Sequence, residues 1–101
     1  MRKNIRQKIL NIVKLLPLNE PIGFDSIVYI HISRSINPGD WYITHKNDEG
    51  ELCGYFKGGS STWFSMSIDD FEDINLPFGE ELLIYKSSEG LTLDILIKSF
   101  S

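Results

Sequence analysis

The sequence predicts an α+β domain in which an N-terminal amphipathic helix packs on a mainly antiparallel, bent sheet of five or six strands. Three observations predict this. Apolar residues recur with a helical period in the first sixteen residues, later segments are short and rich in β-branched and aromatic residues, and short polar turns separate them. Strands joined by short turns pair antiparallel, and the helix must bury its apolar side on their sheet. The length of 101 residues fits one domain, 1–101.

The first predicted element is a helix that ends near residue 16. Its apolar residues share one side at spacings of i, i+4, i+7, i+8 and i+11, and they are Ile5, Ile9, Ile12, Val13 and Leu16. Pro17 disfavours helical geometry at the residue before it, so the helix stops there. The polar side is basic, and we expect those bases to hydrate the outer face of the helix.

Several strands follow the helix. The segment 24–36 is rich in β-branched residues and apolar on both faces, which is typical of a central strand. The runs 41–46 and 51–57 flank a four-residue polar loop that ends in Gly50, and this pattern predicts a hairpin. A further turn at 58–61 leads to a possible strand at 62–66.

A short acidic helix is predicted near 68–74, followed by a last hairpin. Ser67 and Asp70 have the spacing of a helix start, and acids in the first turn favour the positive end of the helix dipole. The runs 81–86 and 91–98 flank a turn at 87–90, so we expect two final strands.

Charge is unevenly distributed along the chain. Residues 1–16 carry five bases and no acid, whereas residues 17–101 carry five bases and all fourteen acids, a balance of −9. A body this negative repels a nucleic-acid backbone, because such binding depends on neutralising phosphates with Lys and Arg. It attracts a basic protein instead. We therefore expect a basic protein partner and no direct contact with nucleic acid.

The acids are densest in one segment. Residues 68–81 contain six carboxylates and no Lys or Arg, and the six are Asp69, Asp70, Glu72, Asp73, Glu80 and Glu81. Helix capping accounts for some of them, but six exceed what capping requires. We therefore treat this segment as a candidate binding surface, interleaved with Phe71 and Phe78.

Aromatic residues gather in the predicted strands as three adjacent pairs, 41–42, 55–56 and 63–64. Neighbouring residues of a strand point to opposite faces of its sheet. Each pair is therefore expected to place one ring in the core and one outside, with Trp41, Tyr55 and Trp63 as candidates for the outward rings. A row of outward rings is suited to an interface.

The alternatives involve the few residues that bear catalytic chemistry. His31 and His45 could act as acid and base in a metal-independent ribonuclease, with Asp40 or Asp25 orienting one ring. Cys53 with His45 and Asp40 could form a thiol triad, although a lone Cys is more often a buried apolar residue. The acidic run lacks the spacing of a calcium loop, and one Cys with two separated His cannot close a zinc site.

The sequence thus favours a small acidic binding protein that inhibits or neutralises a basic partner. Immunity proteins against bacterial nuclease toxins and phage-encoded inhibitors share this profile of small size, acidity and lack of catalytic motifs, which is an analogy of profile and not of residues. A homo-oligomeric module built on outward rings is a third hypothesis. No cofactor is expected. A single Cys and the absence of an apolar run long enough to span a membrane predict a cytoplasmic protein.

Overall fold

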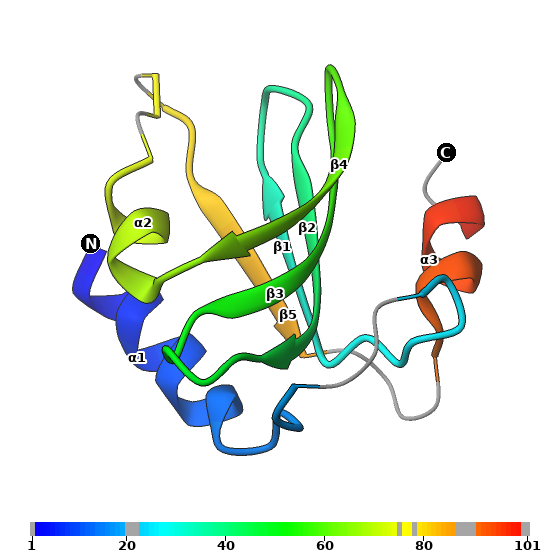
Figure 1. Ribbon diagram of the computed structural model, residues 1–101. Helices are drawn as coiled ribbons and strands as arrows, with labels where there is room; N and C mark the ends of the chain where they lie inside the picture. Colours follow the sequence, from blue (N-terminus) through cyan, green and yellow to red (C-terminus); the bar gives the residue numbers. More distant parts are fainter. Residues whose placement is uncertain (1, 20–22, 75, 78, 87–90, 100–101) are drawn as a thin grey trace.

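The computed structural model describes residues 2–19, 23–74, 76–77, 79–86 and 91–99. It contains a five-stranded antiparallel sheet with helices, so the predicted α+β class is confirmed (Figure 1). The strands lie in the order β4-β3-β2-β1-β5. In chain order the elements are α1 (Arg2–Val13), β1 (Ile30–Arg34), β2 (Asp40–Lys46), β3 (Leu52–Lys57), β4 (Ser61–Met66), α2 (Ile68–Glu72), β5 (Leu82–Lys86) and α3 (Leu93–Ser99).

Consecutive hairpins build most of the sheet. Each strand from β1 to β4 pairs antiparallel with the next, and β5 then returns to pair with β1. The predicted hairpin at 41–57 and the strand at 62–66 are therefore confirmed. The twisted sheet leaves β4 and β5 as its two edges (Figure 1).

Glycine makes one of these pairings possible. A Cβ built on Gly54 would lie 1.8 Å from the backbone oxygen of Tyr42. The register between β2 and β3 shifts at this point, between Ile43 and His45. Only a residue without a side chain permits so close an approach, as is usual for glycine beside a bulge.

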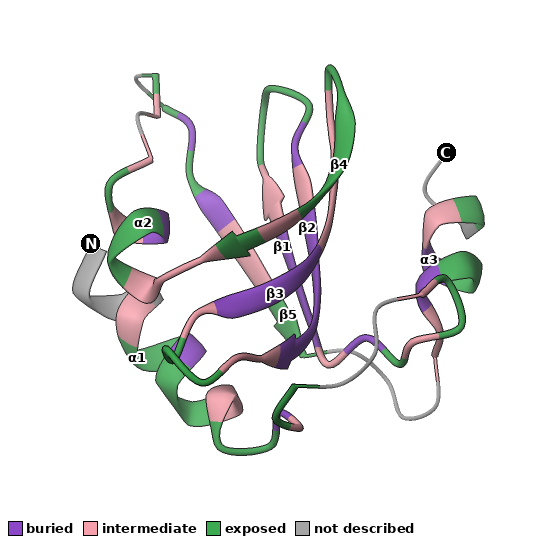
Figure 2. Ribbon diagram, in the orientation of Figure 1, coloured by how far each residue is buried: buried purple, intermediate pink, exposed green. Residues whose placement is uncertain are grey.

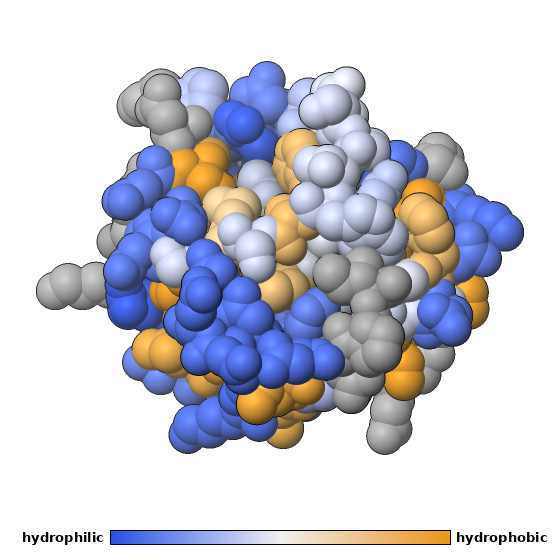
Figure 3. All heavy atoms as spheres, viewed as in Figure 1, coloured by the Kyte–Doolittle hydropathy of each residue, from blue (hydrophilic) through white to orange (hydrophobic). Residues whose placement is uncertain are grey.

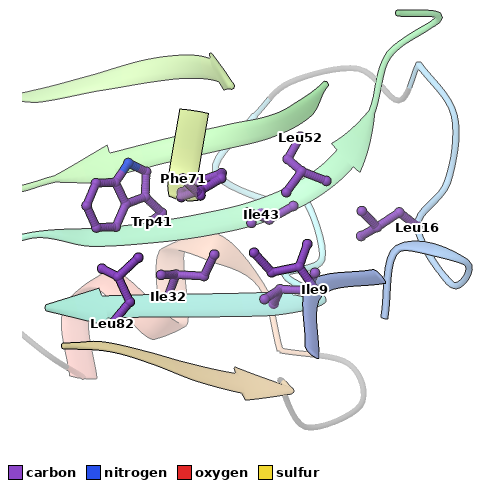
Figure 4. Packing of buried hydrophobic residues seen from close by; sticks show 9 residues of the cluster. Ile9, Leu16, Ile32, Trp41, Ile43, Leu52, Phe71 and Leu82 are labelled. Atoms are coloured by element: carbon purple, nitrogen blue, oxygen red, sulfur yellow. The ribbon is translucent and has the colours of Figure 1, made fainter. Parts of the chain in front are cut away.

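The larger core lies between one face of the sheet, here called the helix face, and the helices α1 and α2. Figure 4 shows Ile9 of α1 and Phe71 of α2 among the side chains of this core, and both are fully buried. The remaining buried members come from the strands and from the turn after α1: Leu16, Ile30, Ile32, Trp41, Ile43, Leu52 and Leu82. Strand β2 is accordingly the most buried strand of the sheet (Figure 2).

A smaller core lies on the opposite face, here called the aromatic face. Val28 and Tyr42 pack there against Leu93 and Leu96 of α3. The helix is held mainly by the loop before β1, because the backbone nitrogens of Leu93 and Asp94 donate to the oxygens of Ser26 and Phe24. In Figure 1, α3 lies to the right of the sheet, and α1 and α2 lie to its left.

The prediction of a final strand at 91–98 was wrong, because this segment forms α3. Alternating Leu and Ile indicated a strand, yet Leu93, Leu96 and Ile97 also fall at helical spacing. Thr92 then starts the helix, with its hydroxyl accepting from the backbone nitrogen of Ile95 at 3.4 Å. Asp94 and Lys98 pair at 3.3 Å one turn apart along its exposed side.

The predicted central strand at 24–36 is shorter than expected. Residues 23–27 form turns and an isolated bridge, and β1 begins only at Ile30. The Ser26 nitrogen bonds the oxygen of Gly23 at 3.1 Å, and the Ile27 bridge is to Thr92. Contacts with the segment before α3 thus replace strand pairing in this part of the chain.

Candidate functional site

The acidic helix α2 begins as its sequence predicts. The Ser67 hydroxyl accepts from the Asp70 nitrogen at 3.1 Å, and the Asp70 carboxylate accepts from the Ser67 nitrogen at 3.0 Å. These two bonds form a capping box. Phe71 turns inward and is fully buried against Trp41 and Phe64. The helix is therefore fixed by its cap and by one buried ring, and its carboxylates lie outside the core.

Arg6 of α1 neutralises part of this acidic helix. Its guanidinium forms ion pairs with Asp69 and Glu72, and its Nε donates to Glu72 Oε1 at 2.9 Å. The hydrogen bonds that Arg6 donates to Glu72 and then to Asp69 raise the pKa of Arg6 above its ordinary value. Four carboxylates, those of Asp69, Asp70, Glu72 and Asp73, thus face one described cation, which leaves a local balance of −3.

The outer carboxylates of α2 remain open to solvent. The Asp69 side chain is 74% exposed, and both Asp70 and Asp73 are exposed, whereas the Glu72 side chain is only 20% exposed. Figure 3 shows hydrophilic surface over α2, at the left of the view. The exposed part of the acidic helix therefore consists of Asp69, Asp70 and Asp73, and below we call these three residues the acidic surface.

Glu80 belongs to a different site from α2. Its side chain is fully buried and pairs with Arg34, whose Nε lies 2.7 Å from Oε1. The other oxygen, Oε2, accepts from the backbone nitrogen of Asn37 at 2.6 Å and from its side chain at 2.8 Å. Burial alone would raise the pKa of Glu80, but these bonds outweigh it and lower the pKa below the ordinary value. Glu80 thus stabilises the β1–β2 turn through its bonds to Arg34 and Asn37. The side chain of neighbouring Glu81 is exposed.

The aromatic residues of the predicted site lie in three different environments. Trp41 is 7% exposed and packs in the helix-face core against Phe56 and Phe71, so it points inward rather than outward. The burial of Phe71 and Trp41 removes both rings from the surface of the folded molecule. Phe78 lies outside the described residues. Tyr55 and Trp63 lie on the other side of the sheet, where their ring centroids are 4.9 Å apart.

A continuous row of rings crosses the aromatic face. Register places one member on each strand, opposite its neighbours, in the order Tyr85, His31, Tyr42, Tyr55 and Trp63. The row is buried at its centre and open at its ends: Tyr42 is fully buried, whereas Tyr85 is 50% and Trp63 is 37% exposed. Phe24 covers the Trp63 end, with its ring centroid 5.3 Å from that of Trp63.

Sequence reasoning found only part of this row. It identified Tyr55 and Trp63 as candidate outward rings, but it did not place Tyr85, His31 and Phe24 with them. Strand register brings Tyr85 and His31 into the row, and Phe24 reaches it from the loop before β1 through ring contacts with Tyr55 and Trp63. Local sequence patterns do not predict which strands pair or in what register, so they could not predict this row.

His31 occupies the most polar point of the row. Its Nε2 lies 2.8 Å from Asp40 Oδ1, and its ring stacks on Tyr42 with centroids 4.6 Å apart. Asp40 therefore orients this imidazole, as predicted for one of the two histidines. The Tyr42 hydroxyl is buried without a hydrogen-bond partner in the described part of the chain. Its burial, and then the charge of Asp40, raise its pKa to about 12.

The second histidine has different contacts. His45 is buried, and its Nδ1 lies 2.9 Å from the hydroxyl of Thr44. It pairs across strands with Cys53, whose sulfur lies 3.0 Å from the hydroxyl of Ser65. The predicted triad of Cys53, His45 and Asp40 does not assemble, since Asp40 bonds His31 instead. His31 and His45 thus have separate described partners, and neither is exposed.

Comparisons with known proteins identify no relative. No family model, curated protein or solved structure matches the chain. Among the residues that the structure describes, no three His, Cys, Asp or Glu side chains gather to hold a metal ion. No helix in the same residues has the length and apolar character to cross a membrane.

Proposed function

We propose that this protein binds a basic protein partner through the acidic surface of α2, and that it inhibits or neutralises that partner. The observation that carries the proposal is the local balance of −3 on α2, with three carboxylates exposed beside a single paired arginine. Exposed charge of one sign, held on a capped helix, steers a partner of opposite charge.

The partner's cationic side chains would meet Asp69, Asp70 and Asp73. These charges mainly set the association rate, which falls as salt screens them. Arg6 pairs with both Asp69 and Glu72, which reduces the repulsion between these two carboxylates. Buried Glu80 has no role in this contact, and neither do the buried rings of Trp41 and Phe71.

An immunity protein against a nuclease toxin, or a phage-type inhibitor, matches this proposal. The targets of such proteins bind nucleic acid through a basic cleft, to which a carboxylate cluster is complementary in charge. The proposed compartment is the cytoplasm, where a buried free thiol such as that of Cys53 stays reduced.

Capture from the native host tests the proposal. We expect the purified protein, used as bait, to retain a basic protein that salt elutes. A triple variant, Asp69→Asn, Asp70→Asn and Asp73→Asn, should retain much less of it. Retention of the same protein by wild type and triple variant alike would exclude α2 as the binding surface.

A further inference from the structure

Strand β4 is an edge strand of the sheet, and one of its two sides has no paired strand among the described residues. Its six residues pair with β3 in an unbroken register, from Leu52 opposite Met66 to Lys57 opposite Ser61. In the described part of the chain no strand pairs with its other side. The three residues at its start are exposed, as is Ser65. A row of backbone donors and acceptors is thus available to another strand.

This edge lacks the features that usually prevent pairing. The sequence STWFSM contains no charged residue and no proline, and its register shows no bulge. The surface over the upper part of β4 in Figure 3 is correspondingly pale, neither strongly hydrophilic nor strongly hydrophobic. Each edge strand contacts a helix, α1 beside β5 and α2 beside β4. The two edges differ in charge, because β5 ends in Lys86 and β4 carries no charged residue.

The ring row of the aromatic face ends at this edge. Trp63 contacts Tyr55 and Phe24 on its inner side, and it is 37% exposed. A strand added beside β4 would place one residue directly opposite Trp63 on the same face. A second aromatic residue there would extend the row, and cross-strand aromatic pairs stabilise sheets.

We propose that β4 pairs antiparallel with β4 of a second copy of this chain, about a two-fold axis that passes beside Trp63. An axis perpendicular to the sheet keeps each face with its like face, so Trp63 meets Trp63 of the second copy. Ser61 then lies opposite Ser65, and Thr62 opposite Phe64. The two sheets join into one, and the interface is the same patch on both copies, as a symmetric dimer requires.

Charge permits this arrangement. No charged residue lies on β4, so the two strands meet without local repulsion. In an antiparallel pair the end of each β4 lies beside the start of the other. The acidic helix α2, which follows β4, therefore lies beside the uncharged turn 58–60 of the second copy and far from the other α2.

The expected dimer is weak and depends on salt in a distinctive way. One six-residue strand forms a small interface, so we expect a dissociation constant of about 10 μM to about 1 mM. Each copy carries a net charge of −4, so long-range repulsion opposes dimerisation. Added salt should therefore strengthen the dimer, because it screens that repulsion. Salt should weaken binding to a basic partner, so the two contacts can be told apart.

Sedimentation equilibrium of the whole chain tests the proposal. The wild type should dimerise between about 10 μM and about 1 mM, and more tightly in about 300 mM than in about 50 mM NaCl. Trp63→Lys places two ammonium groups face to face and should raise the dissociation constant at least about tenfold. Asn11→Lys is the matched control, because it adds the same charge at an exposed position of α1, outside the proposed interface. It should dimerise like the wild type.

A second strand variant and an NMR measurement also test the pairing of β4 with β4. If Trp63→Lys fails to fold by circular dichroism, Ser61→Lys takes its place, at an exposed position of the strand itself. A mixture of isotope-labelled and unlabelled protein should show nuclear Overhauser contacts between Trp63 rings of different copies. A wild type that stays monomeric throughout the concentration range would overturn the proposal. So would a dimer that the strand variants leave unchanged.

Discussion

At the scale of single residues, two adjacent glutamates differ in burial and in hydrogen bonding. Glu80 is buried and receives hydrogen bonds from Arg34 and Asn37, whereas Glu81 is exposed. Breaking a buried, hydrogen-bonded ion pair leaves its partner without compensation, which is costly. Removing an exposed charge changes little. The β1–β2 turn therefore depends on the side chain of Glu80, whereas Glu81 bonds Ser35 of this turn through its backbone alone.

Glu80→Gln should lower the melting temperature, and Glu81→Gln, the matched control, should leave it nearly unchanged. The lowered pKa of Glu80 also fixes the pH dependence. A carboxyl group whose folded pKa is depressed stabilises the protein above its unfolded pKa, near 4.5, and loses that effect as pH falls through the folded value. The difference in melting temperature between the wild type and Glu80→Gln should therefore become smaller at acidic pH. Thermal melts from neutral pH down to pH about 3 measure this difference. Equal effects of the two substitutions would contradict the buried pair.

Tyr42 provides a second residue-scale prediction. Its hydroxyl is buried without a described partner, and a buried polar group left unsatisfied costs free energy. Tyr42→Phe should therefore raise the free energy of unfolding by about 1 kcal/mol, as measured by urea denaturation. Tyr55→Phe, in the same ring row and partly exposed, should change it less. A loss of stability in Tyr42→Phe would show that the hydroxyl is bonded.

The pKa of Tyr42 gives the same residue a signature at high pH. Because the folded pKa of Tyr42 is raised from 10 to about 12, the folded state favours the protonated hydroxyl, so stability is greatest below pH 10 and falls as pH rises through the folded value. Absorbance titration of tyrosinate should show one late-titrating residue. That step should disappear in Tyr42→Phe. Four tyrosines that titrate together near pH 10 would contradict this burial.

At the scale of elements, the sequence predicts correctly where local signals dominate. The cap of α2 lies within four residues, and the hairpin at 41–57 lies on either side of its own turn. Residues 91–98 satisfy both a strand and a helix pattern, and contacts with the loop at 24–28 decide between them. The same loop shortens the predicted strand at 24–36. Where a segment is locally ambiguous, tertiary packing determines its structure.

The candidate site follows the same rule. The acidic run was visible in the sequence, but the arginines that partly neutralise it come from far along the chain. Arg6 reaches Asp69 and Glu72 from α1, and Arg34 reaches Glu80 from β1. A local count of charge therefore overstates the acidity of 68–81. Strand alternation places Trp41 and Tyr42 on opposite faces of the sheet, but it does not show that both faces are covered there, and both rings are buried. Phe71 lies on the buried side of α2 instead.

Helix α3 should be the least protected element of the fold. It packs on a small cluster of four buried residues, whereas β2 and β3 lie within the larger core. Local stability follows buried apolar contact, so backbone amides of α3 should exchange with solvent at least about tenfold faster than those of β2. Hydrogen exchange measured by NMR checks this. Equal protection of α3 and β2 would show that the second cluster is stronger than its size indicates.

At the scale of the whole molecule, the sheet separates two surfaces that the sequence suggested were one. Phe71 places α2 over the helix face, whereas Tyr55 and Trp63 lie on the aromatic face. A single patch of acids flanked by exposed rings is therefore absent from the described surface. The acidic surface suits a basic partner, and the ring row with the β4 edge suits a second copy. Salt acts on these two contacts in opposite directions.

The central claim is that the charge of α2, rather than the net charge of the protein, recruits a basic partner. The most direct test is the association rate of the captured partner at low salt, compared between two triple variants of equal net charge. Asp69→Asn, Asp70→Asn and Asp73→Asn should slow association at least about tenfold. Asp25→Asn, Asp48→Asn and Glu49→Gln, all at exposed positions elsewhere, should slow it less than about threefold. Equal slowing by both triple variants would contradict the claim.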